Sequence, residues 1–153
     1  MKTIHQWLDE YGSSHRNDTN KLIHWICVPA IFFSIVGFLY AIRIPVPGTS
    51  IILTVAQIAL VLLIIYYARL SSSLAVGMTI IGIICLWLWR LIAATGAPIW
   101  LVSLIIFVLA WIGQFIGHKI EGAKPSFFKD LQFLLIGPAW LLSFIYKKTG
   151  IKL

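Results

Sequence analysis

Four long apolar segments dominate the hydrophobic pattern of this chain. Each holds about the 20 residues that a helix needs to cross a bilayer, and they cover Leu22–Ile42, Ser50–Ala68, Leu74–Ala94 and Pro98–Gly117. Short stretches that contain serine, glycine, proline or arginine separate the segments, as is typical of turns between helices. The pattern therefore predicts an all-α polytopic membrane protein with four transmembrane helices.

The N-terminal residues have a different pattern. Over residues 3–11, apolar side chains recur at helical spacing, at Ile4, Trp7, Leu8 and Tyr11. Such spacing gives one apolar face and one polar face. We therefore expect an amphipathic helix that lies on the membrane interface ahead of the first span.

The last apolar stretch, Leu131–Tyr146, has only 16 residues and contains Gly137-Pro138. Charge decides how we interpret it, because Lys and Arg accumulate on the cytoplasmic side of membrane proteins. With four spans and a cytoplasmic N-terminus, ten of the 12 Lys and Arg residues lie inside, and only Arg43 and Arg90 lie outside. A fifth crossing would change this split to seven and five. We therefore expect a C-terminal re-entrant or interfacial hairpin, with both chain termini in the cytoplasm.

The composition agrees with a protein surrounded by lipid. Of the 153 residues, 60% are hydrophobic and 11% are charged, whereas soluble domains carry about 25% charged residues. This predicts a single transmembrane domain over residues 1–153. The net charge of +7 arises from bases at the ends of apolar segments. Since these bases form no patch among aromatic residues, nucleic acid is not an expected partner.

Three of the four histidines are expected at the same water–lipid face. His15 and His24 flank the entry to the first apolar segment, and His118 closes the fourth. On one continuous helix, His15 and His24 would point to opposite faces. They can share a site only if the chain bends between them, which the intervening polar residues permit. We interpret the three histidines as a candidate metal site, with contacts to lipid headgroups as the alternative.

Polar residues near the histidines extend this candidate site. Asn20 lies one turn before His24 and is predicted to orient its ring through a hydrogen bond. Gln114 and Glu121 share a helix face with His118. Glu121 is a candidate ligand or acid–base group, or it only pairs with a neighbouring lysine. Imidazole and carboxylate ligands suit iron(II), and zinc accepts the same ligands, so the residue types leave the metal open.

Two blocks of sequence contain all of these residues: YGSSHRNDTNKLIHWICVP near the N-terminus, and WIGQFIGHKIEGAKP far downstream. Together they resemble the 2-hydroxy fatty acid dioxygenase family, which includes fungal endoplasmic-reticulum enzymes of fatty acid α-oxidation and many bacterial members. The resemblance covers nearly the whole chain. It implies an Fe(II)-dependent oxidoreductase that converts a 2-hydroxy fatty acid and O₂ into an acid one carbon shorter, with CO₂ and water.

The resemblance also implies roles for individual residues. The implied metal ligands are His15, His24 and His118, and the matching motif positions beside them are Asn20, Gln114 and Pro125. We expect the protein to be integral to a bacterial inner membrane, in contact with its lipids, with the metal site facing the cytoplasm. The alternative is a non-enzymatic lipid-binding or assembly protein whose histidines contact headgroups. The metal content of the purified protein distinguishes these two hypotheses.

Overall fold

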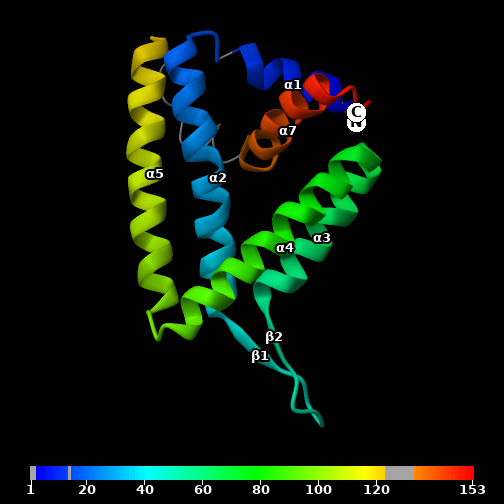
Figure 1. Ribbon diagram of the computed structural model, residues 1–153, viewed down its shortest axis with the longest axis vertical. Helices are drawn as coiled ribbons and strands as arrows, with labels where there is room; N and C mark the ends of the chain where they lie inside the picture. Colours follow the sequence, from blue (N-terminus) through cyan, green and yellow to red (C-terminus); the bar gives the residue numbers. More distant parts are fainter. Residues whose placement is uncertain (1–2, 14, 123–132) are drawn as a thin grey trace. The chain divides into compact units, whose positions relative to one another are not determined.

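The computed structural model describes residues 3–13, 15–122 and 133–153, and this part of the chain is mostly helical (Figure 1). The helices are α1 (Ile4–Ser13), α2 (Asp18–Ala41), α3 (Val55–Leu70), α4 (Ser72–Ala94), α5 (Ile99–Glu121) and α7 (Ile136–Thr149). The other elements are the strands β1 (Arg43–Pro45) and β2 (Ile52–Thr54) and the 3-10 turn η1 (Phe133–Leu135). The chain packs as two compact units: unit 1 combines Met1–Phe32 with Val108–Leu153, and unit 2 is Phe33–Phe107.

Three helices are long and apolar enough to cross a membrane. They are α2 with 24 residues and α4 and α5 with 23 residues each. The predicted segments Leu22–Ile42, Leu74–Ala94 and Pro98–Gly117 fall on these helices, and every boundary agrees to within four residues. The predicted association with a membrane therefore agrees with the helices that the chain forms.

The second predicted span, Ser50–Ala68, differs from the structure at its start. Arg43–Pro45 and Ile52–Thr54 pair as antiparallel strands, with Arg43 opposite Thr54. Thr54 then begins α3 through a capping box with Gln57. The helix has 16 residues, or about 24 Å at 1.5 Å per residue, against roughly 30 Å of bilayer hydrocarbon. The all-α prediction missed this hairpin because counting apolar residues does not separate a β-branched strand from a helix.

Unit 2 is organised around Trp89 of α4, which is completely buried. Its ring stacks on Phe33 of α2, with 4.6 Å between the ring centroids and 13° between the ring planes. Its indole Nε1 donates a hydrogen bond of 2.9 Å to the carbonyl oxygen of Phe33. Gly37, one turn further along α2, leaves the space that the Trp89 ring and the buried hydroxyl of Ser103 occupy.

Gly37→Ala is expected to lower the free energy of unfolding by about 1–3 kcal/mol, the usual cost of overpacking a core. The new methyl group would overlap Trp89 and Ser103, neither of which has room to withdraw. Gly82→Ala on α4 is the matched control, because its methyl would lie 3.4 Å from Leu60, an ordinary contact. Thermal unfolding in detergent should show a lower midpoint for Gly37→Ala alone. Equal midpoints for the two variants would contradict this packing.

Unit 1 contains the predicted amphipathic helix, observed as α1. Thr3 and Gln6 form a reciprocal cap at its start: the Thr3 N–H donates to Gln6 Oε1, and the Gln6 N–H donates to Thr3 Oγ1. Its apolar face is buried rather than open to lipid, with Ile4, Leu8 and Tyr11 at most 9% exposed. Helix α7 packs against α1 (Figure 1). The apolar face predicted to rest on the membrane is thus covered by protein.

The C-terminal stretch Leu131–Tyr146 is not interrupted at Gly137-Pro138. Residues 131–132 lie outside the described part, and the remainder is the turn η1 followed by the continuous helix α7. Gly137 and Pro138 occupy the first turn of α7, where backbone N–H groups have no helical acceptor, so a proline costs little. The dipeptide thus begins a helix rather than interrupting the stretch, and the re-entrant or interfacial hairpin stays a prediction.

Candidate metal centre

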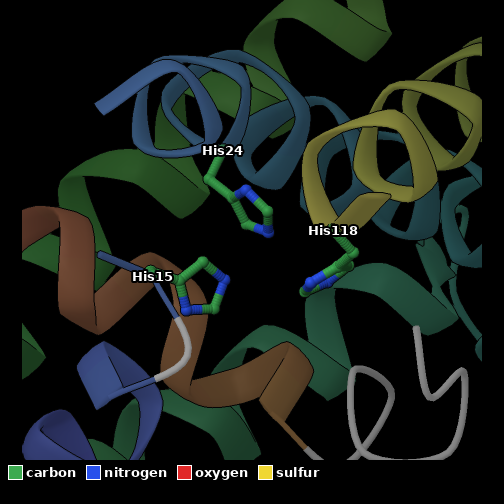
Figure 2. Close-up of side chains that lie close together, drawn as sticks. All are labelled: His15, His24 and His118. Atoms are coloured by element: carbon green, nitrogen blue, oxygen red, sulfur yellow. The ribbon is translucent and has the colours of Figure 1, made fainter. Parts of the chain in front are cut away.

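The three histidines reach one place from three parts of unit 1. His15 lies in the connection after α1, His24 in the second turn of α2, and His118 in the last turn of α5. Figure 2 shows the three rings turned toward one shared space. One ligand nitrogen from each residue lies within 4.8 Å of the others. The side chains are 3%, 1% and 4% exposed, respectively. Three buried imidazoles at this spacing could hold a metal ion.

The chain bends between His15 and His24, as the sequence required. The His15 N–H donates to the carbonyl of Gly12, which continues the end of α1 by a turn. The side-chain oxygen of Asn17 then accepts from the N–H groups of Thr19 and Asn20. Asn17 therefore caps the start of α2. With two helices in place of one, both histidines can face the same site.

Backbone carbonyls determine which ring nitrogen carries hydrogen in two of the histidines. His15 Nδ1 lies 2.7 Å from the carbonyl oxygen of Tyr11, and His24 Nδ1 lies 2.9 Å from that of Asn20. A carbonyl oxygen only accepts, so Nδ1 is the donor in each pair. The Nε2 atom of each neutral ring keeps the lone pair that a metal requires. The donor set of neutral imidazoles fits a divalent transition metal.

Glu121 is not part of this histidine cluster among the described residues. Its Oε1 accepts from the Arg16 N–H at 2.8 Å and the Asn17 N–H at 3.2 Å. Its Oε2 accepts from the Asn17 N–H and the Asn20 side-chain amide, both at 2.9 Å. The carboxylate thus ties the end of α5, three residues after His118, to the loop that carries His15.

The hydrogen bond predicted between Asn20 and the His24 ring is present, at 2.9 Å. The backbone carbonyl of Asn20, rather than its side chain, holds the ring of His24. Its side-chain amide donates to Glu121. The side chain is completely buried and lies where a side chain at Gly117 would be, so a Cβ atom at Gly117 would overlap Asn20 Oδ1. Gly117 therefore allows α2 and α5 to approach closely beside His118.

Gln114 lies one turn before His118 on α5 and is buried. It lines a pocket next to the cluster. Pro125, the remaining motif position, lies outside the described residues. Both polar residues predicted to support the site are therefore buried, Asn20 on α2 with its amide bonded to Glu121, and Gln114 on α5 in the wall of the pocket.

Two aromatic residues contribute to the site without having been predicted to do so. The Tyr11 ring stacks on His15, with 4.3 Å between centroids and 18° between planes. Trp140 of α7 lies 5.4 Å from His15 and 5.2 Å from Tyr11, centroid to centroid, and is buried. The position of Tyr11 one turn before His15 was a signal in the sequence. No local signal pointed to Trp140, because only the packing of α7 on α1 brings it there.

The sequence matches the model of one protein family over residues 1–149, nearly the whole chain. That family is described as 2-hydroxy-palmitic acid dioxygenase Mpo1-like. No curated protein and no solved structure gives a match. The matched region includes His15, His24 and His118 together with all the residues that surround them.

Proposed function

We propose, since the chain belongs to the 2-hydroxy-palmitic acid dioxygenase Mpo1-like family, that it is an Fe(II)-dependent membrane enzyme that shortens 2-hydroxy fatty acids. The family resemblance expected from the two sequence blocks is confirmed. In the proposed reaction, one 2-hydroxy acid and one O₂ give an acid one carbon shorter, one CO₂ and one water. The bond between C1 and C2 breaks, C1 leaves as CO₂, and C2 becomes the new carboxyl carbon. The electrons lost by these two carbons reduce O₂.

The observation that carries this proposal is the burial of three converging histidines. Histidines that only contact lipid headgroups would have to be exposed at the membrane surface. His15, His24 and His118 are each at most 4% exposed, so their rings are directed toward one another instead. This burial supports a metal enzyme over the alternative of a non-enzymatic lipid-binding or assembly protein.

His15, His24 and His118 are the residues that would hold the metal ion. Iron(II) bound by imidazoles with open positions would supply the chemistry that activates O₂. The carbonyl groups of Tyr11 and Asn20 keep the first two rings in the tautomer with Nε2 available. The stacked ring of Tyr11 and the nearby indole of Trp140 cover one side of His15. These aromatic groups limit the access of water to the reacting atoms.

The proposed activity can be tested directly on the purified protein. Metal-free protein is reloaded with Fe(II) and incubated with O₂ and 2-hydroxypalmitic acid, and the products are identified by mass. We expect a fatty acid one carbon shorter and an equal amount of CO₂. A parallel sample reloaded with zinc should give neither product. Absence of the shorter acid in the iron-loaded sample would refute the proposed function.

We further propose a single transmembrane domain in which α2, α3, α4 and α5 all cross the membrane. In this layout the helices contact the lipids of a bacterial inner membrane. The ten-to-two split of Lys and Arg favours a cytoplasmic location for both chain termini and for the metal site. The shorter α3 fits if the bilayer thins locally or its flanking residues reach to the interface. The packing of α1 against α7 supports a shared side for both ends of the chain.

Reporter fusions test this topology. A reporter that is active only in the cytoplasm should be active at both the N-terminus and the C-terminus, because ten of the 12 Lys and Arg residues would then lie inside. The same reporter inserted at Gly48, at the tip of the hairpin between β1 and β2, should be inactive. A reporter that requires export should give the opposite pattern. An exported C-terminus would contradict the four-span layout.

A further inference from the structure

The pocket next to the histidine cluster is small and lies within unit 1. It offers about 20 Å³ to the centre of a water-sized molecule. A cavity needs roughly 10–15 Å³ of such space to hold one water molecule. Helices α2 and α5 form its walls together with α1, the turn η1 and the start of α7. The pocket therefore has room for about one water molecule and for no longer ligand.

One wall of the pocket is the side chain of Gln114, which lies on α5 one turn before His118. Gln114 is 5% exposed, and within the described part of the chain its carboxamide forms no hydrogen bond with another residue. A carboxamide offers two N–H donors and one acceptor oxygen. Burying these groups without partners costs free energy. The carboxamide therefore requires a hydrogen-bonding partner inside the pocket.

A second polar group, the hydroxyl of Tyr11, also lies at the pocket. Tyr11 and Gly137 both line it, and a Cβ atom at Gly137 would lie 3.3 Å from the Tyr11 hydroxyl oxygen. A phenol hydroxyl both donates and accepts hydrogen bonds, so it can bind a further partner beside those it has in the protein. The walls formed by Val28, Ile31 and Leu134 are apolar. Two polar side chains in an apolar wall meet the need of a buried water molecule, which is about two to four polar partners.

We propose that the pocket binds one ordered water molecule, held between the Gln114 carboxamide and the Tyr11 hydroxyl. The proposal concerns the metal centre and does not depend on the reaction proposed above. The water joins α5, which carries His118, to α1, which precedes His15. Tyr11 in turn holds His15 in two ways: its ring stacks on the imidazole, and its carbonyl oxygen accepts from Nδ1. Gln114 is therefore a positioning residue that acts on His15 through the water and Tyr11.

Radiolytic labelling of the purified wild-type protein tests the water site directly. A short X-ray pulse splits water into hydroxyl radicals, which oxidise side chains next to a bound water even where bulk solvent does not reach. Trp111 lines the pocket and is 6% exposed, whereas Trp89 is completely buried in unit 2. We expect mass spectrometry to find oxidation of Trp111 but not of Trp89. Protection of Trp111, or equal oxidation of the two tryptophans, would overturn the water site.

Gln114→Met tests which group holds the water, because methionine is unbranched like glutamine and lacks its strong donors and acceptor. We expect a several-fold lower rate of Trp111 oxidation in this variant. Ser103→Ala is the matched control, since it also removes a buried polar group from α5, and Ser103 lies in unit 2 rather than at the pocket. It should leave the rate unchanged. A wild-type rate in Gln114→Met would show that radicals reach Trp111 from bulk solvent and would overturn the assignment.

The link to His15 is tested by a double-variant cycle on metal affinity, which needs no turnover. Co(II) binding is followed by its visible absorption in Gln114→Met, in Tyr11→Phe, which keeps the stacked ring, and in the double variant. We expect each single change to weaken Co(II) binding by about tenfold and the double variant to weaken it no further, because both remove the same link. Additive losses or wild-type affinity would refute the positioning role. Absence of Co(II) binding in the wild-type protein would refute the metal centre, while the labelling of Trp111 still decides the water site.

Discussion

His118→Ala is expected to lose its metal ion and all turnover of 2-hydroxy acids while folding and inserting normally. His118 is one of the three imidazoles that would hold the metal. Loss of a ligand should weaken metal binding by far more than the roughly 10–100-fold that is typical when a residue hydrogen-bonded to a ligand is removed. Insertion depends on the apolar spans, and these are unchanged. His15→Ala and His24→Ala should behave in the same way.

Elemental analysis of the purified variants measures metal per chain, and circular dichroism reports their helical content. His5→Ala is the matched control, because His5 lies on α1 and is exposed. It should keep both the metal and the activity. Full metal occupancy in all three histidine variants would show that these residues do not form a metal site. Surviving activity in His118→Ala would refute the proposed mechanism.

Glu121→Gln should weaken metal binding by about 10–100-fold without abolishing it. The carboxylate accepts hydrogen bonds at both oxygens from Arg16, Asn17 and Asn20. An amide has only one acceptor oxygen, and its NH₂ group would face other donors. The loop that carries His15 would therefore be held less firmly against α5. Titration of metal-free protein with Co(II), followed by its visible absorption, measures the affinity.

The double variant Glu121→Gln with Asn20→Asp separates a positioning role from a ligand role. The amide introduced at position 121 would donate to the carboxylate introduced at position 20, which reverses the donor and acceptor of the present bond. We expect partial recovery of metal affinity in the double variant. Asp18→Asn is the control, because Asp18 is exposed and bonds only to Lys21, at 3.0 Å, in the described part of the chain. Metal loss as complete as in His118→Ala would make Glu121 a ligand, and unchanged affinity would make it a surface residue.

The sequence by itself determined the features that depend on local geometry. The helical period of 3.6 residues and the length of a bilayer crossing are set by the backbone. Apolar runs therefore located α2, α4 and α5, and periodic apolar residues located α1. The two motif blocks were sufficient to identify the family. The same blocks contain the three histidines, which were candidate metal ligands because the predicted spans bring them to the same water–lipid face.

Only the tertiary structure decided which groups meet. His118 is far from His15 and His24 in the sequence, and their distances depend on how α5 packs against α2 beside Gly117. The packing of α7 on α1 brings Trp140 to His15 and buries the face that was expected to rest on lipid. The partners of Glu121 follow from the bend after α1, where backbone N–H groups of the loop become available. Such pairings arise from long-range packing and hydrogen bonding, which residue spacing along one segment does not encode.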